Sequence, residues 1–156
     1  EMRRLTFLTL LPLGLLLASC SGGGGPADPA LVAGLRRSRD LWASRSVADY
    51  RYTLHVSCFC TPEQTRPVRI EVRGGVRASV TYADSGAPAD PALFAQYDSV
   101  DKLFALLEKE INAPADRITA RYDPVFGYPV DAFIDPIERA ADEELGLSVR
   151  SFEIIP

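Results

Sequence analysis

Histidine is nearly absent from this chain: its 156 residues include one histidine, one tryptophan and three cysteines. No second pair of Cys or His residues stands at ligand spacing, so the pattern argues against a zinc site. Basic residues are not in excess, because 17 Lys and Arg are outnumbered by 21 Asp and Glu and the net charge is −4. Nucleic-acid-binding domains normally carry a basic surface, so we expect no nucleic acid as a partner.

Motifs of several enzyme classes are missing as well. There is no Gly-x-Ser-x-Gly sequence, and the single histidine has no evident catalytic partner, which argues against a serine hydrolase. No thioredoxin-like Cys-x-x-Cys occurs, and the length fits one domain, without room for separate cofactor and substrate domains. We therefore predict no catalytic residue and favour a protein that is not an enzyme.

Long hydrophobic runs are lacking too. The uncharged run at residues 5–17 follows the basic residues Arg3 and Arg4, and as a helix it would be about 20 Å long. The hydrocarbon core of a bilayer is about 30 Å thick, so this run is too short for a stable span. A basic start, a short apolar segment and small residues before a cleavage site are typical of a signal peptide, which we predict for residues 1–19.

The end of this segment carries a lipid-attachment pattern. The sequence Leu17-Ala18-Ser19-Cys20 resembles the bacterial lipobox, and this resemblance implies that Cys20 becomes an acylated N-terminus carrying a diacylglyceryl thioether. The alternative is a plain signal peptide with Cys20 as a spare thiol. Residues 20–27 then form a glycine-rich tether. We expect an extracytoplasmic lipoprotein anchored in a membrane, which is the outer membrane in a two-membrane bacterium because serine follows the cysteine.

Residues 28–156 predict a single α+β domain. Asp28 and Pro29 are typical of a helix start, and Ser99 caps a second helix whose apolar stripe ends at Ile111. The expected architecture is an antiparallel sheet of about six strands, in two three-strand sets, with both helices packed on one face. Period-two alternation predicts the strands at residues 50–60, 68–72, 76–82, 118–122, 130–134 and 145–155.

Three segments depart from regular alternation. A two-residue loop at residues 74–75 would pair Arg73 with Val76 and mix charged with apolar side chains, so we predict a three-residue loop that pairs Val72 with Val76. The alternation slips near Arg150, which predicts a β-bulge in the last strand. Residues 83–98 have no clear period and are expected to form a long connection.

Cys58 and Cys60 are the most distinctive local pair. In an extended strand their Cα atoms would be about 6.6 Å apart, near the upper limit for a disulfide, so a bond requires the strand to turn, which Pro62 permits. We favour a structural disulfide over a redox-active pair, and a metal site is the weakest interpretation. His55 falls on the opposite strand face and is predicted to face solvent.

Acidic residues gather in the last third of the chain. Carboxylates at turns can hold calcium, so Asp135, Asp142 and Glu143 are candidate ligands, although no EF-hand spacing occurs and solvated turn acids are the favoured interpretation. The turns also suggest a surface site formed by Asp123, Tyr128 and Asp131.

An ordered set of residues resembles bacterial lipoproteins that carry the uncharacterised DUF6174 domain. The resemblance covers about residues 40–153, and it implies membership of that family but no activity, because the family has none established. Leu147 departs from the pattern, where an aromatic residue is expected. The matching residues are Trp42, Tyr50-Arg51-Tyr52, Cys58-Phe59-Cys60-Thr61-Pro62-Glu63, Pro67-Val68-Arg69-Ile70, 100–104, Arg121-Tyr122-Asp123-Pro124, Gly127-Tyr128-Pro129, Ile134-Asp135 and Asp142-Glu143-Glu144.

These features predict a lipid-anchored binding or envelope-interaction module. Its partners would be the membrane, reached through the lipid on Cys20, and an envelope protein or ligand, and we expect a monomer. The alternatives are a thiol-redox protein that uses Cys58 and Cys60, or a calcium-binding module that uses the acidic turns. Apart from the covalent lipid, no cofactor is expected unless calcium binds.

Overall fold

The computed structural model describes residues 27–156, apart from 114, 138 and 141. The predicted signal peptide, the predicted acylation site at Cys20 and nearly all of the predicted tether lie outside the described residues. In the part that the structure describes, no helix is both long enough and apolar enough to traverse a bilayer.

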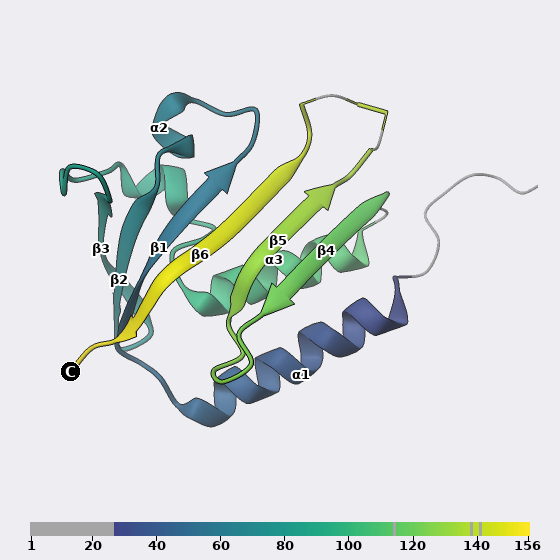
Figure 1. The fold of residues 1–156 in the computed structure, drawn as a ribbon, viewed down its shortest axis with the longest axis horizontal. Helices are drawn as coiled ribbons and strands as arrows, with labels where there is room; N and C mark the ends of the chain where they lie inside the picture. Colours follow the sequence, from purple (N-terminus) through teal and green to yellow (C-terminus); the bar gives the residue numbers. More distant parts are fainter. Residues whose placement is uncertain (1–26, 114, 138, 141) are drawn as a thin grey trace, which may run out of the picture.

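One six-stranded antiparallel sheet organises the molecule (Figure 1). Its order is β3-β2-β1-β6-β5-β4, so the two three-strand sets meet where β1 pairs with β6. This confirms the α+β prediction and the grouping of the strands. The strands are β1 (Tyr50–Ser57), β2 (Val68–Arg73), β3 (Val76–Tyr82), β4 (Arg117–Tyr122), β5 (Pro129–Asp135) and β6 (Leu145–Ile154).

Two long helices cover one face of the sheet and leave the other face open (Figure 1). Helix α1 (Pro29–Arg45) begins where the Asp28 carboxylate accepts a hydrogen bond from the Ala30 N–H at 2.8 Å. Helix α3 (Val100–Asn112) begins where the Ser99 hydroxyl accepts one from the Lys102 N–H at 3.2 Å. Both predicted starts are confirmed, because these side chains satisfy N–H groups that lack a partner inside the helix. Two short elements, α2 (Pro62–Thr65) and the 3₁₀ helix η1 (Pro91–Phe94), complete the fold.

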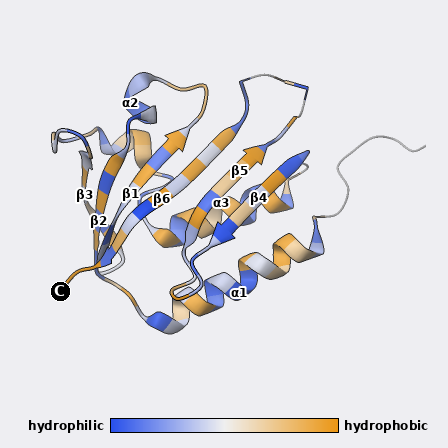
Figure 2. Cartoon of the chain, viewed as in Figure 1, coloured by the Kyte–Doolittle hydropathy of each residue, from blue (hydrophilic) through white to orange (hydrophobic). Residues whose placement is uncertain are grey.

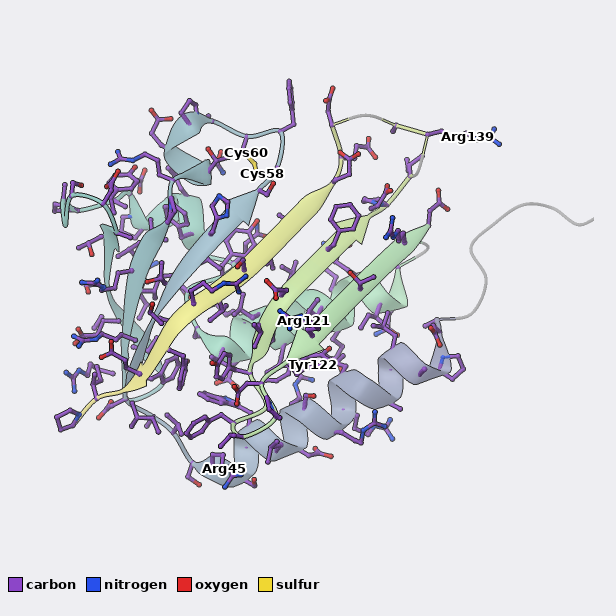
Figure 3. The ribbon with its side chains drawn as sticks, in the orientation of Figure 1. Arg45, Cys58, Cys60, Arg121, Tyr122 and Arg139 are labelled. Carbon is purple, nitrogen blue, oxygen red and sulfur yellow. A yellow bond between two sulfur atoms is a disulfide. The ribbon has the colours of Figure 1, made fainter. Side chains whose placement is uncertain are left out.

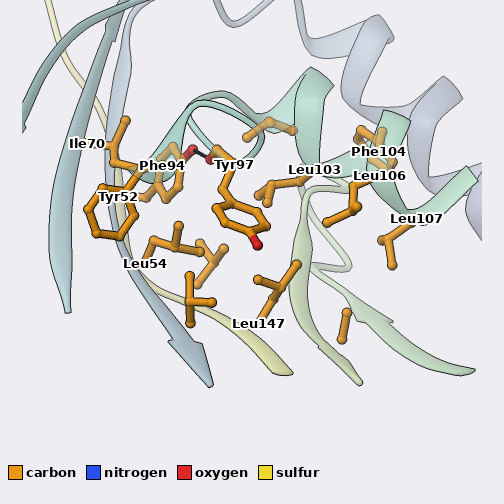
Figure 4. Close-up of a cluster of buried hydrophobic side chains, with 14 of the residues drawn as sticks. Tyr52, Leu54, Ile70, Phe94, Tyr97, Leu103, Phe104, Leu106, Leu107 and Leu147 are labelled. Atoms are coloured by element: carbon orange, nitrogen blue, oxygen red, sulfur yellow. Dashed lines mark hydrogen bonds between the residues drawn. The ribbon is translucent and has the colours of Figure 1, made fainter. Parts of the chain in front are cut away.

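The core lies between the sheet and the helices. Along the strands hydrophobic and hydrophilic residues alternate (Figure 2), because successive side chains point to opposite faces. Helix α3 contributes its apolar stripe to the same core. Figure 4 shows the central cluster, which includes Tyr52, Leu54, Ile70, Phe94, Tyr97, Leu103, Phe104, Leu106, Leu107 and Leu147.

The connection at residues 83–98 contributes more to the core than its sequence suggests. Phe94, at the end of η1, is fully buried, and Tyr97 is nearly so. The Tyr52 hydroxyl donates a hydrogen bond to the Tyr97 carbonyl at 2.5 Å. This segment therefore closes the core beside β1, and a connection without periodicity is part of the packing.

The predicted three-residue loop between β2 and β3 is wrong. Residues 74–75 form a two-residue loop with φ angles of 57° and 76°, as a type I′ turn requires, and Arg73 pairs with Val76. The register shifts after the next pair, Val72 with Arg77, so Ala78 has no partner across the ladder. That bulge restores the apolar side chains to the inner face and leaves Val76 69% exposed.

The predicted bulge in the last strand is confirmed. Arg51 pairs with Glu153 but Thr53 pairs with Arg150, so one residue of β1 faces two residues of β6. Ser151 takes a positive φ of 49° at this point. The bulge turns Phe152 toward Tyr50, and their ring centroids are 5.5 Å apart.

Candidate functional site

A groove of about 350 Å³ lies on the open face of the sheet, over β4, β5, β6 and β1. Gly146 on β6 is part of its lining. A Cβ atom at this position would lie 3.2 Å from the Cβ atom of Ser57 on β1, so a larger residue here would crowd Ser57 and take up part of the groove. On the other side Gly146 pairs with Phe133 of β5, whose side chain is half-buried.

The strand register places four polar side chains in one row across this groove. Arg121 pairs with Asp131, Asp131 with Ser148, and Ser148 with His55. Directly opposed side chains in antiparallel strands have Cβ atoms about 4.5–5.5 Å apart, so residues far apart in the sequence become neighbours. His55 faces solvent as predicted, but sequence reasoning did not identify the row.

One signal for the groove was present in the sequence. A glycine inside a strand often marks a place where another group approaches closely, and Gly146 stands inside the predicted last strand. The signal shows that a hollow can form, but it does not indicate which side chains surround it.

Asp131 is the electrostatic centre of this site. Its carboxylate forms ion pairs with Arg121 on β4 and, at 3.1 Å, with Arg150 on β6. Burial alone would raise the pKa of Asp131, but the hydrogen bonds from the two guanidinium groups outweigh it and hold the pKa below its usual value. The three side chains together carry a net charge of about +1.

The row does not form a hydrolase relay. In a catalytic triad the histidine stands between the nucleophile and the carboxylate, because it accepts a proton from one and is oriented by the other. Here Ser148 lies between Asp131 and His55. The order is therefore wrong for that chemistry.

Cys58 and Cys60 form a disulfide, with Cα atoms 5.2 Å apart (Figure 3). The chain bends as predicted, since β1 ends at Ser57 and α2 follows from Pro62, with Thr61 as its N-cap residue. Cys58 packs partly against the core, whereas Cys60 is exposed. Phe59 between them is 80% exposed.

The predicted surface site of Asp123, Tyr128 and Asp131 is divided by the structure. The Asp123 carboxylate accepts hydrogen bonds from the Val125 and Phe126 N–H groups at 2.9 and 2.7 Å, which fixes the turn between β4 and β5. Tyr128 stacks on an aromatic ring of β6, and burial followed by the nearby Asp123 charge raises its pKa. Asp131 lies on the groove with its two arginines, so only this residue belongs to the candidate site.

Of the candidate calcium ligands, Asp135 is the last residue of β5, and Asp142 and Glu143 follow that strand. Asp135 is buried, whereas Asp142 and Glu143 are exposed. Among the described residues, no group of three or more His, Cys, Asp or Glu side chains is placed to hold a metal ion. Calcium binding at these residues stays a prediction.

Tyr122, labelled in Figure 3, carries a buried hydroxyl that has no hydrogen-bond partner among the described residues. We expect Tyr122→Phe to raise the free energy of unfolding by about 1 kcal/mol, because it removes an unsatisfied polar group. Tyr52→Phe should instead lower it, since that hydroxyl donates to the Tyr97 carbonyl. Thermal denaturation at neutral pH compares the two variants, and a destabilised Tyr122→Phe would contradict the expectation.

The same tyrosine should make the free energy of unfolding vary with pH in the alkaline range. Burial raises the pKa of Tyr122 to about 12, above its usual value near 10. The folded state therefore favours the neutral phenol over the phenolate. The contribution of this preference to the free energy of unfolding is complete below about pH 10 and is lost as the pH rises toward 12. We expect Tyr122→Phe to lose less stability than the original chain over that range, as measured by denaturant titration. Equal losses would contradict the assignment.

Comparison with protein families identifies one match. Residues 34–154 match the model of a family described as a family of unknown function (DUF6174). Searches of curated proteins and of solved structures found no match. The matched range runs from within α1 to the end of β6 and so includes the disulfide and the groove. The chain therefore belongs to DUF6174, a family of unknown function, as the sequence resemblance predicted.

Proposed function

We propose that this protein is a lipid-anchored extracytoplasmic binding module whose ligand site is the groove on the open sheet face. The observation that carries the proposal is the groove at Gly146, whose volume of about 350 Å³ falls within the range of small-molecule sites. The lipobox-like sequence that ends at Cys20 supports the anchor, and the glycine-rich segment after it supports a domain held away from the membrane.

The lining of the groove suits recognition of a small ligand. Phe133 offers an apolar ring, Ser148 a hydroxyl, and Arg121 a guanidinium, all on rigid strands of one sheet. A few polar groups around an apolar surface fix the orientation of a ligand. Because these side chains project from paired strands, binding requires little ordering of the backbone.

The chain provides its own reporter for this test, because His55 is its single histidine and lines the groove. We would titrate the protein with 3-phenylpropanamide, a neutral molecule with one aromatic ring, and follow the His55 ring proton by NMR. A saturable shift with a Kd on the order of 1 mM is expected for a molecule of this size. No shift of His55 at any concentration would overturn the proposal.

Two variants test whether such a shift comes from the groove. Gly146→Val fills the hollow and should abolish the shift. Ser79→Val places the same side chain on β3, at an exposed position outside the groove, and should leave the shift unchanged. Trp42 is the single tryptophan and is buried on α1, so its fluorescence reports whether each variant is folded. A shift that persists in folded Gly146→Val would place binding elsewhere and contradict the proposal.

The anchor is tested separately in cells. A fatty-acid analogue should label the full chain but not its Cys20→Ala variant, because the thioether forms on that sulfur. Equal labelling of the two chains would contradict lipidation at Cys20, and it would leave the groove unaffected as a ligand site.

A second candidate function is thiol-disulfide exchange at the Cys58–Cys60 disulfide. It is favoured by one observation, the exposure of Cys60 next to its bonded partner. A reduction potential between about −120 and −270 mV would match known thiol oxidoreductases, whereas a value below about −300 mV would leave only a structural role.

A further inference from the structure

Positive charge exceeds negative charge at the groove. Two arginines share the single carboxylate of Asp131. Arg121 and Asp131 belong to the groove's described lining, whereas Arg150 lies at its edge. Elsewhere on the open face, the ion pairs Arg51–Glu153 and Arg73–Glu71 are one-to-one. Asp131 and its two arginines thus form a local excess of about one positive charge at the edge of the groove, in a chain whose net charge is negative.

The arginines remain accessible although they are paired. The side chain of Arg121 is 73% exposed and that of Arg150 is 56% exposed, against 30% for Asp131. A guanidinium has five N–H donors. The described hydrogen bonds of Arg121 use one nitrogen, Nη2, toward Asp131, so its other N–H groups can reach a ligand. Arg150 is more fully engaged, since its Nη1 donates to the Val149 carbonyl at 3.0 Å and its Nη2 to Asp131. Asp131 therefore holds both guanidinium groups in place, and Arg121 has the larger number of unused donors.

The apolar part of the groove lies one row away from this charge. Phe133 and Gly146 pair with each other two residues along the strands from Asp131 and Ser148, which is a distance of about 6.8 Å. The guanidinium of Arg117 lies 5.6 Å from the centre of the Phe133 ring, so this ring is held on one side. A ligand that contacts both rows would therefore need an anionic group about 6.8 Å from an apolar group.

We infer that the groove binds a small carboxylate, with the carboxylate group at Arg121 and Arg150 and an apolar group over Gly146 beside Phe133. This inference rests on the proposed function of the groove as a ligand site. The charge favours a carboxylate over a phosphate, because one negative charge neutralises the excess of one positive charge, whereas a phosphate brings about −1.5 to −2. Guanidinium groups also match the planar, two-oxygen geometry of a carboxylate.

A matched pair of probes tests the charge requirement. 3-Phenylpropionate carries a carboxylate where 3-phenylpropanamide carries a neutral amide, and the two molecules have nearly the same shape. We expect the carboxylate to bind about tenfold more tightly, which corresponds to about 1.4 kcal/mol, and we expect the preference to shrink as salt is added. The readout is again the NMR shift of His55.

Variants identify the source of the preference. Arg121→Gln and Arg150→Gln should each reduce the affinity for the carboxylate several-fold and leave that for the amide unchanged. Arg69→Gln, on β2 of the same face and outside the groove, should change neither affinity. Equal losses for both probes in Arg121→Gln and Arg150→Gln would overturn the inference, because the arginines would then not act through charge.

The outcomes separate this inference from the proposal beneath it. If neither probe shifts His55, the groove is not a ligand site for such molecules and both statements fail. If both probes bind equally well, the groove stands as a ligand site and the carboxylate requirement is wrong. If 2-phenylethyl phosphate binds more tightly than 3-phenylpropionate, the assignment of a carboxylate rather than a phosphate is overturned.

Discussion

Replacing Gly127 by alanine is expected to lower the free energy of unfolding by about 3 to 5 kcal/mol. Gly127 takes a φ of 89°, which costs other residues energy, and it lies in the turn between β4 and β5. A Cβ atom there would lie 2.3 Å from the Ser38 carbonyl oxygen and 3.0 Å from the Trp42 backbone nitrogen. Both atoms belong to the backbone of α1, so the clash is relieved only if the helix moves away from the turn.

Gly86→Ala is the matched control for this substitution. Gly86 has a similar φ of 71°, but nothing lies within 4 Å of its Cβ position. We expect it to cost about 1 kcal/mol, the backbone penalty alone. Urea denaturation of both variants gives the difference that belongs to the helix contact. If both substitutions cost the same, close packing of the turn against α1 does not contribute to stability.

Replacing Phe104 by alanine is also expected to lower the free energy of unfolding by about 3 to 5 kcal/mol. Phe104 lies on α3, is fully buried, and stacks against Tyr122 of β4 with ring centroids 6.2 Å apart. Its removal leaves a cavity between the helix and the sheet that surrounding atoms fill only in part. The expected result is a large drop in the urea midpoint with little change in its slope.

Two milder changes at the same place test the cause. Phe104→Leu keeps most of the apolar volume and should cost about 1 to 1.5 kcal/mol. Glu108→Ala breaks the exposed ion pair with Arg39, whose atoms are 2.8 Å apart, and should cost about 1 kcal/mol or less. A Phe104→Ala variant no weaker than Glu108→Ala would contradict a core role for this ring.

Local patterns in the sequence were sufficient to predict most elements of the fold. Alternation from Tyr50 identified β1, and capping residues located the starts of both long helices. The β2–β3 loop was mispredicted because two arrangements satisfy the same alternation. A three-residue loop and a two-residue loop followed by a bulge at Ala78 both bring the apolar residues inward, and the sequence does not distinguish them.

The candidate site was predictable only where its residues are sequence neighbours. Cys58 and Cys60 are two residues apart, so a disulfide could be anticipated. Asp131 was grouped with Asp123 and Tyr128, its neighbours in the sequence, whereas the structure places it beside Arg121 and Arg150. The row that joins Arg121 and Asp131 to His55 depends on how β1 pairs with β6. No local sequence pattern determines the register of that pairing.

The position of β6 in the sheet has a consequence for the order in which the molecule forms. The last strand of the chain lies between β1 and β5, and the Arg51–Glu153 ion pair joins residues 102 positions apart. A growing chain can therefore make its two hairpins early, but the centre of the sheet must wait for residues 145–154. Such late, long-range closure is slow. If the proposed export takes place from the N-terminus onward, the chain completes its sheet only after its final strand has emerged.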